Sequence, residues 1–531
     1  MLKQTPISQL IRQGYFLGLV MLATSLTLSP FVMSAAQFWL IGIWIIDGIV
    51  NKDFKAKCSR FWHNKAAVIL VAFYLLHVVG LAYTADFQYA MKDLRVKLPL
   101  LLLPFLFAST EPLDRKHFDL LLNIYVLSVF VATWFSFAAY LKHDYEDVRE
   151  ISHFISHIRF CLHIVFCMAI TAYYLFTRSS KWWSKLLQIA VILWFGYQIY
   201  IFESLSGYVV LAAVIVVSIL YAFLEWKKAK AWRITIVAIA IVALSASAIF
   251  LSQMVKPLVK IEPVDYAALE KKTAQGNYYW HDTIHNPVED GHYVGLYYCR
   301  KELQETWPLR SELAINGQTT NGENLEATLA RYLTSKGLRK DAEGVMALSD
   351  KDIQNIEQGI PNYNNWLHPG IRARLSSTIF EYNLYRHYNN PNGGSLSQRI
   401  EYTRASFHII KKHPLFGVGT GDVPNAFAEA YNEIQSPLSD EFRYRAHNQY
   451  LAITVAFGLV GLALFLTSLL FPYFSSKKNR HYLYTIFLCV ILLSMFPEDT
   501  LETQAGASLF AFFNALLLFK YPTENTNNKI S

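Results

Sequence analysis

A polar, cationic segment turns into a long apolar run at Arg443-Tyr-Arg-Ala-His-Asn-Gln-Tyr-Leu-Ala-Ile-Thr-Val-Ala-Phe-Gly-Leu-Val-Gly461. The run is long enough to cross a bilayer, and it predicts a membrane-spanning helix over 447–473. At about 100° per residue, five positions share one stripe of this helix: His447, Leu451, Thr454, Gly458 and Gly461. The small residues on the stripe would let a neighbouring helix approach closely. His447 would lie at the mouth of the helix, in a cationic pocket open to water.

The composition indicates a membrane protein. The chain has 531 residues, of which 53% are hydrophobic and 17% charged, and its mean hydropathy is +0.24. These values exclude an ordinary soluble protein. The net charge of +8 does not predict a nucleic-acid partner, because the cations lie mostly in short loops between apolar runs, where they orient a membrane protein.

We predict an all-α polytopic membrane protein with about twelve transmembrane helices, each near the length that a bilayer requires. The apolar run near the N-terminus continues into a second span without a small-residue cleavage site, so we expect no cleavable signal peptide. The predicted spans are 14–30, 35–50, 66–84, 96–109, 118–141, 153–177, 186–202, 204–224, 232–253, 447–473, 481–497 and 504–520.

The loops alternate in charge along the chain. Lysine and arginine gather in the loops near 52–65, 178–185, 227–233 and 477–480, whereas 143–150 and 497–502 are acidic or mixed. The positive-inside rule then places both termini in the cytoplasm and 254–446 outside. The predicted domains are a nine-span membrane domain (1–253), a large, partly helical external loop (254–446), a three-span membrane domain (447–520) and a cytoplasmic tail (521–531). Cys299 is the one external cysteine, so we expect no intramolecular disulfide there.

Two charged groups near the outer face of the membrane are candidate site residues. Arg159 would lie about two turns into the span 153–177, where an arginine is costly unless it faces a polar cavity or a partner. Glu203, near the same face, is a possible partner. Three histidines close to Arg159 lack a convergent cysteine or carboxylate on the same helix, so we predict no metal site: His153, His157 and His163.

The second external loop reads TADFQYAMKDLRVKLP over 84–99. Apolar residues at helical spacing predict an interfacial helix, whose cations would lie at the depth of the lipid headgroups. Two interpretations stay open. The cations anchor the helix at the interface, as is common, or Arg95 or Lys97 contacts an anionic lipid headgroup.

The external segment combines a long insert with a helical segment that leads to the last three spans. The insert 256–390 has helical patterns, and its HDTIH run is interpreted as a polar loop because it lacks the glutamate and helix of a zincin. After the break at 391–394, the segment 395–446 predicts a helix that carries Arg399 and Arg404. The glycine-rich turn Gly417–Gly421 follows, and its glycines would allow the close backbone approach that suits a phosphate.

The segment 395–513 resembles the O-antigen ligase/polymerase superfamily of membrane glycosyltransferases. The resemblance rests on His-Pro-Leu-Phe-Gly-Val-Gly-Thr-Gly at 413–421, on His-Asn-x-Tyr-Leu followed by the spacing His447-x10-Gly458, and on Leu-Glu-Thr-Gln-Ala-Gly at 501–506. The sequence departs from the family at Leu205-Ser206-Gly207, where the family often has an arginine after the serine. Arg159 or an external arginine is expected to take that role, unless the substrate differs. The insert is also longer than the family leads us to expect.

The resemblance implies a GT-C-like enzyme in a bacterial inner membrane, with the long loop in the periplasm. It would transfer a glycan from an undecaprenyl-diphosphate-linked donor to a hydroxyl of lipid A-core, as an O-antigen ligase does. The alternatives within the superfamily are a polysaccharide polymerase, which uses a glycan acceptor, and a protein O-oligosaccharyltransferase. A flippase for lipid-linked sugars is less well supported, because the ionisable groups lie towards the outer side and no repeat is apparent. A receptor would leave the cationic junction unexplained.

The chemistry of the transfer assigns roles to individual residues. His447 suits the general base, since Arg443 and Arg445 would favour its neutral form. Arginines suit the diphosphate because they bind it bidentately without a metal or cofactor. The arginines expected at the diphosphate are Arg443, Arg445, Arg399 and Arg404, with Arg159, Arg95 and Lys97 as further candidates. The supporting residues are Asn448, Gly458, Gly461, Glu502 and Glu203.

Overall fold

The computed structural model describes residues 6–142, 148–178, 181–225, 245 and 249–522. The chain forms two compact units. The membrane unit consists of Met1–Arg233, Tyr402–Ser436 and Arg443–Ser531, and the insert unit of Ile234–Glu401 and Pro437–Phe442. This division differs from the predicted domains, because Tyr402–Ser436 belongs to the same unit as the apolar helices.

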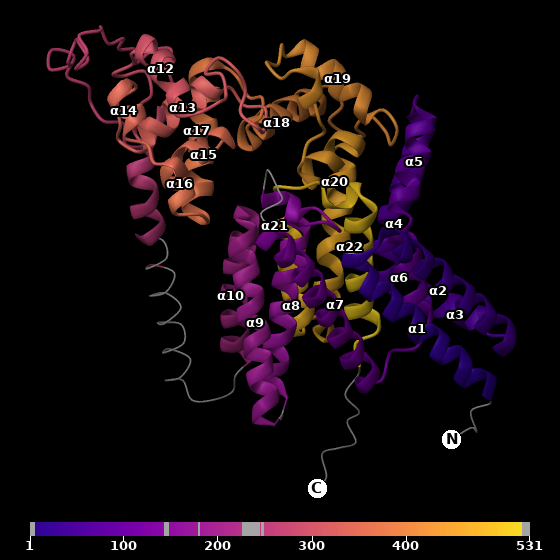
Figure 1. The fold of residues 1–531 in the computed structure, drawn as a ribbon. Helices are drawn as coiled ribbons and strands as arrows, with labels where there is room; N and C mark the ends of the chain where they lie inside the picture. Colours follow the sequence, from indigo (N-terminus) through magenta and orange to yellow (C-terminus); the bar gives the residue numbers. More distant parts are fainter. Residues whose placement is uncertain (1–5, 143–147, 179–180, 226–244, 246–248, 523–531) are drawn as a thin grey trace. The chain divides into compact units, whose positions relative to one another are not determined.

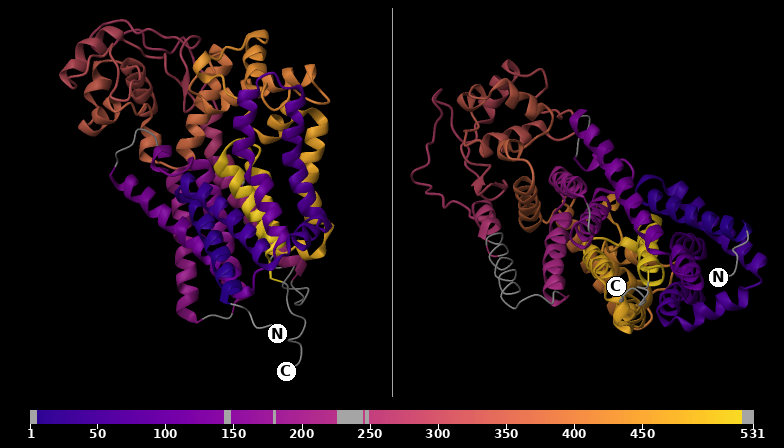
Figure 2. Two further views of the ribbon diagram at one scale, coloured as in Figure 1. Left: turned by 90° about the vertical axis from the view of Figure 1, so that its right-hand side faces the viewer. Right: turned by 90° about the horizontal axis from the view of Figure 1, so that it is seen from below.

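The described residues of the membrane unit form helices joined by turns and loops (Figures 1 and 2). Helix α18 (Ser395–Lys412) crosses the division between the units. The other elements are α1 (Pro6–Leu28), α2 (Pro30–Asn51), α3 (Phe54–His63), α4 (Lys65–Val79), η1 (Gly80–Tyr83), α5 (Phe87–Lys97), α6 (Pro99–Ser109), α7 (Arg115–Lys142), η2 (Val148–Ile151), α8 (His157–Thr177), α9 (Trp182–Phe202), α10 (Leu205–Glu225), α19 (Val423–Glu433), α20 (Gln449–Ser475), η5 (Lys477–Asn479), α21 (Tyr482–Ser494), η6 (Thr500–Glu502) and α22 (Gln504–Phe519).

Eight helices in the described part of the chain are long and apolar enough to cross a membrane: α1, α2, α4 with η1, α7, α8, α9, α10 and α20. They correspond to eight of the twelve predicted spans. The apolar helices Tyr482–Ser494 and Gln504–Phe519 are shorter, as is α6. The ninth predicted span, 232–253, falls mostly outside the described residues. The structure therefore confirms an all-α membrane fold, and the count of twelve stays a prediction.

Local signals explain where several helices begin and end. Ser29 separates α1 from α2, since its Oγ accepts a hydrogen bond from Val32 N at 3.3 Å and Pro30 occupies the first turn of α2. Glu203 ends α9 in the left-handed conformation, with φ of 49°. A non-glycine residue seldom adopts this conformation, and it turns the chain directly into α10.

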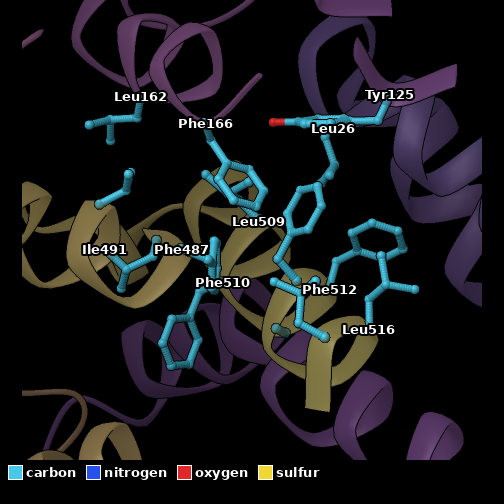
Figure 3. Packing of buried hydrophobic residues seen from close by; sticks show 14 of the residues in the cluster. Leu26, Tyr125, Leu162, Phe166, Phe487, Ile491, Leu509, Phe510, Phe512 and Leu516 are labelled. Carbon is cyan, nitrogen blue, oxygen red and sulfur yellow. The ribbon is translucent and has the colours of Figure 1, made fainter. Parts of the chain in front are cut away.

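The C-terminal helix α22 lies within the bundle (Figure 1), where it packs against α1, α5, α6 and α21. Helix α21 in turn packs against α8 and α10. Aromatic side chains fill the space between these helices (Figure 3): the rings of Phe166 and Phe487 are 5.4 Å apart, and those of Phe166 and Phe513 are 4.9 Å apart. Because α22 is buried on most sides, the loop that precedes it is held rigidly.

Helix α20 is broken at Gly458, which has φ of 63° and ψ of −162°. The segment around Gly417 fills the break: Leu459 N donates to Pro414 O at 2.8 Å, and Gly419 N donates to Ala456 O at 2.9 Å. A Cβ on Gly458 would lie 2.2 Å from the carbonyl carbon of Leu415. The predicted uninterrupted helix is therefore wrong, and Gly458 makes room for backbone rather than for a neighbouring helix.

The insert unit is a separate, small α-rich unit. Its β-hairpin turns at Asp290 and Gly291, which both have positive φ (48° and 88°), as a two-residue type I′ turn requires. Trp307 and Tyr332 lie fully buried in its apolar core. Its elements are the helix Ile249–Val259, β1 (Val288–Glu289), β2 (His292–Tyr293), α12 (Arg300–Thr306), η3 (Trp307–Leu309), α13 (Leu325–Ser335), α14 (Ala342–Met346), α15 (Asp350–Glu357), α16 (Tyr363–Leu367), α17 (Ile371–Tyr388) and η4 (Asp440–Phe442).

Candidate functional site

His447 lies just before α20, not inside it. Its φ is 44°, in the left-handed region, and the next residue, Asn448, is the N-cap: its Oδ1 accepts from Leu451 N at 3.0 Å. Asn448 Nδ2 also donates to Phe496 O at 2.9 Å. The predicted stripe that joined His447 to the helix face is therefore wrong. An N-cap amide forces the preceding residue out of helical geometry, and Asn448 ties this junction to the loop before α22.

Aromatic and acidic groups surround His447. Its ring centroid lies 5.4 Å from that of Tyr402 in α18 and 6.1 Å from that of Tyr444. Its Nδ1 is 3.8 Å from Asp499 Oδ1, and its side chain is 34% exposed. The distance fits an ion pair with a protonated imidazole and is longer than a hydrogen bond. The imidazole is therefore accessible on one side and faces a carboxylate on another.

The carboxylates beside His447 come from the loop between α21 and α22. Glu498 and Asp499 are both buried, and each pairs with a guanidinium group: Arg159 NH2 lies 3.6 Å from Glu498 Oε2, and Arg445 NH2 lies 3.7 Å from Asp499 Oδ2. Arg159 is the third residue of α8, so it lies in the first turn of that helix; its depth in the membrane stays a prediction. Glu498 occupies the position of ion-pair partner that was predicted for Glu203.

Arg445 also joins a second group of buried charges. Its NH1 donates to Tyr89 OH at 3.1 Å and to Glu502 Oε2 at 3.2 Å. Lys97 Nζ lies 2.8 Å from Glu502 Oε2 and 2.8 Å from Asp93 Oδ2. Lys97 is only 4% exposed, so the predicted contact of Lys97 with a lipid headgroup is wrong. The ion pair with Asp93, four residues earlier, directs the Lys97 side chain inwards. Lys97 then stabilises the loop before α22 through Glu502.

Gln449 and Glu502 hold the start of α20 to the loop before α22. Gln449 Nε2 donates to Glu502 Oε1 at 3.1 Å, and Gln449 Oε1 accepts from Leu501 N at 2.6 Å. Glu502 thus contacts Lys97, Arg445 and Gln449 at once, and its supporting role stays a prediction.

The two loop carboxylates that flank Arg445 have opposite pKa shifts. Burial by itself would raise the pKa of Glu502, but the charges of Lys97 and Arg445 outweigh it and lower the pKa to about 2. Burial raises the pKa of Asp499, and Arg445 and His447 only partly oppose the shift. Glu502 is thus a permanent anion, whereas Asp499 accepts a proton more readily than an ordinary aspartate does.

Charged side chains of both signs meet beside His447. Four carboxylates (Asp93, Glu498, Asp499 and Glu502) face three cationic side chains (Arg159, Arg445 and Lys97). The expectation that Arg443 and Arg445 favour the neutral imidazole stays a prediction.

The other predicted cations lie elsewhere. Arg443 NH1 donates to Asn432 Oδ1 of α19 at 2.8 Å, and its guanidinium lies 5.8 Å from the ring centroid of Tyr431. Arg95 and Arg404 are exposed, and Arg399 belongs to the insert unit. The structure thus brings Arg159 and Arg445 into the cluster around His447, and directs Arg443 towards α19.

The glycine-rich turn does not form a phosphate cradle. The backbone N–H groups of Gly417, Val418 and Gly419 are bound to carbonyl oxygens within the chain, and Gly421 N donates to Thr84 Oγ1 at 2.9 Å. A Cβ on Gly417 would lie 2.4 Å from Phe457 N. The glycines therefore serve the close packing of this turn into the break of α20, not the binding of an anion.

Three side chains in the cluster have the spacing of metal ligands. Single ligand atoms of His447, Glu498 and Asp499 lie within 4.8 Å of one another. Sequence reasoning missed both carboxylates, although Pro-Glu-Asp-Thr-Leu-Glu at 497–502 contains them. Both of these carboxylates already have an arginine partner, which provides the charge compensation that a cation would supply.

One comparison with known proteins finds a match around His447. The model of the O-antigen ligase family matches residues 357–466, a range that includes His447 and Gly458 but ends before Glu498. The comparison with curated proteins finds no match. Residues 357–466 are thus similar to the O-antigen ligase family, and the match supports a glycosyltransferase-like function in O-antigen or polysaccharide assembly.

Proposed function

We propose that the chain is an O-antigen ligase-like enzyme of a bacterial inner membrane. It transfers a glycan from an undecaprenyl-diphosphate-linked donor to a hydroxyl of lipid A-core on the periplasmic face. The observation that carries the proposal is the position of His447, half-exposed and backed by the buried carboxylate of Asp499, within the domain that matches the O-antigen ligase family.

In the proposed reaction, His447 removes the proton of the acceptor hydroxyl as its oxygen attacks the anomeric carbon of the donor. The bond from that carbon to the diphosphate breaks, and undecaprenyl diphosphate leaves with the bonding electron pair. Asp499 orients the imidazole and stabilises the imidazolium that forms.

Guanidinium groups stabilise the leaving diphosphate in this scheme. Arg445 and Arg159 share the carboxylates that flank His447, and Arg443 lies two residues before Arg445. Arginine binds phosphate oxygens bidentately, which compensates the developing charge without a metal. Arg95, Arg399 and Arg404 remain predicted contacts to the donor lipid or glycan, whereas Lys97 is assigned to the support of Glu502.

The decisive experiment compares His447→Ala with the wild type in turnover per folded molecule, in detergent or reconstituted membranes. Loss of a general base lowers turnover by about two to four orders of magnitude, while donor binding changes little. His413→Ala is the matched control, because His413 is exposed and lies outside the cluster. If His447→Ala lowers only the amount of folded protein and each molecule keeps normal turnover, His447 is a structural residue and the mechanism fails.

The acceptor is tested in a deletion strain. A ligase uses lipid A-core as its acceptor, so deletion of the ligase removes all long-chain glycan from lipid A-core. A surface glycolipid with a single repeat unit instead identifies a polymerase.

The orientation in the membrane follows from the loop charges: a reporter fused at Gly322 is expected outside the cytoplasm, and one at Lys478 inside. A cytoplasmic reporter at Gly322 contradicts the scheme, since the donor glycan is on the other side.

A further inference from the structure

The insert unit contains a pocket of about 360 Å³ that the transfer mechanism does not use. This volume lies in the range of small-molecule sites, which is about 300–1,000 Å³. Its lining comes from the segment after the helix Ile249–Val259, from the segment that follows β1, and from the turn after α13. The lining residues used below are Glu262, Asp265, His292, Tyr293, Tyr297 and Lys340.

Lys340 is the unusual member of this lining. It is only 3% exposed, yet among the described residues its Nζ has no hydrogen bond or ion pair. Its backbone is held on both sides, since Lys340 N donates to Tyr297 O at 3.0 Å and Cys299 N donates to Lys340 O at 2.7 Å. A buried cation without a partner is costly. The fold therefore holds a buried lysine without an ion-pair partner among the residues that line the cavity.

The local charges do not compensate this ammonium group. Asp341 follows Lys340 in the chain, but its carboxylate caps α14 by accepting from Gly344 N at 2.8 Å and also accepts from Tyr279 OH. Glu262 lies 3.1 Å from the imidazole of His292. Asp265 accepts from Ala267 N at 3.0 Å. Burial lowers the pKa of Lys340 to about 8, although Asp341 opposes the shift, so the amine still carries its proton at neutral pH.

Two tyrosines give the pocket flat apolar surface beside the cation. Tyr293 is half-buried in β2. Tyr297 has φ of 51°, and its ring is held by Arg339, whose guanidinium lies 4.8 Å from the ring centroid. The hairpin that carries Tyr293 is packed closely onto the neighbouring segment, because Glu262 N donates to Gly291 O at 3.0 Å. Ring faces and hydroxyl groups together suit a sugar, which has both apolar C–H faces and polar edges.

We propose that this pocket binds a sugar residue that carries an anionic group, with Lys340 pairing with the anion and Tyr293 contacting the ring. The choice of a sugar as the carrier rests on the proposed function, in which the chain handles glycans. The anion is inferred from the uncompensated cation alone. The insert thereby selects glycans with an acidic unit, such as a uronic acid or a phosphorylated sugar.

The test measures equilibrium binding to the purified full-length protein, without donor or acceptor, by saturation-transfer NMR titration. The probes are glucuronic acid, glucose 6-phosphate and glucose. We expect the wild type to bind at least one acidic probe more tightly than glucose. Lys340→Met is expected to weaken that binding by about 10- to 100-fold, the usual worth of a hydrogen bond to a charged group. The comparison of the two acidic probes distinguishes a carboxylate from a phosphate.

Control variants separate the pocket from the fold. Lys351→Met removes an exposed lysine of α15 in the same unit and should bind as the wild type does. Tyr293→Ala removes a lining ring and should weaken binding of the same probe even if Lys340→Met fails to fold. Equal binding of glucose and the acidic probes, no binding of any probe, or unchanged binding by both Lys340→Met and Tyr293→Ala overturns the inference. His447→Ala should bind normally, so failure of the mechanism is distinguishable from failure of this site.

Discussion

The two units bury a lysine to nearly the same degree and use it in opposite ways. Lys97 in the membrane unit is 4% exposed and Lys340 in the insert unit 3% exposed. Lys97 contacts two carboxylates at 2.8 Å, whereas Lys340 has no ion pair within the described residues. A buried charge that is compensated holds structure together, and one that is not is available to a ligand. Burial alone therefore does not distinguish a structural cation from one that binds a ligand.

The largest expected effect is on stability. Lys97→Met leaves Asp93 and Glu502 without their shared cation, and loss of one partner of a buried pair costs about 3–5 kcal/mol. Lys340→Met removes an uncompensated charge and should leave the stability unchanged or raise it. Thermal unfolding of both variants in detergent measures the contrast. Equal destabilisation by the two substitutions would contradict the different roles assigned to Lys97 and Lys340.

The pH dependence of stability sharpens the same contrast. The pKa of Lys340 is about 8 in the folded chain against an ordinary 10.5, so the unfolded chain binds more protons between these values. Burial of the charged Lys340 therefore lowers the free energy of unfolding below pH 8. As the pH rises from 8 towards 10.5, the free energy of unfolding increases by about 3 kcal/mol in total. Subtraction of the Lys340→Met profile from the wild-type profile isolates this change. A flat difference contradicts the assignment.

The break in α20 should tolerate substitution of its glycine less well than a regular helix does. Gly458→Ala places a Cβ against Leu415 backbone at positive φ, and such strain costs about 1–3 kcal/mol or more. Gly42→Ala in α2 is the control, because a Cβ there meets nothing within 4 Å and alanine favours helix by about 1 kcal/mol. Circular-dichroism melts of the two variants should move in opposite directions.

The two arginines before His447 are expected to differ, although the sequence treats them alike. Arg445→Ala should lower the yield of folded protein, because it removes the guanidinium group that pairs with the buried carboxylates of Asp499 and Glu502. Arg443→Ala should fold and raise the KM for the donor, by about ten-fold for one lost charged contact. Lysine at position 443 should restore this only in part, since it lacks the bidentate fork. Identical behaviour of the two variants rejects the distinction.

The smallest expected effect is that of chelation. If arginines compensate the diphosphate, purified enzyme keeps its turnover in excess chelator. If chelation abolishes turnover and a divalent cation restores it, then His447, Glu498 and Asp499 form a metal site. In that case Glu498→Gln should lower the affinity of the enzyme for the cation.

Part of the site was predictable because it is local in the sequence. His447, Asn448 and the glycine at position 458 follow one another at a fixed spacing, so a resemblance can identify them. Asp499 and Glu498 are about fifty residues away, and nothing in their own neighbourhood assigns them to His447. The inward turn of Lys97 was missed for a similar reason: its i, i+4 partner Asp93 is visible in the sequence, but the contact with Glu502 joins positions 405 residues apart.

The amino-acid sequence alone predicts an α-helical membrane protein, because apolar runs of bilayer length must satisfy their own backbone hydrogen bonds. It also determined which segment carries the family motif. Only the tertiary structure decided which charges are compensated, since that depends on the distance between side chains from different helices. It likewise decided that Gly417 and Gly458 pack against each other's backbone, because two loops far apart in sequence meet there and leave no room for a Cβ.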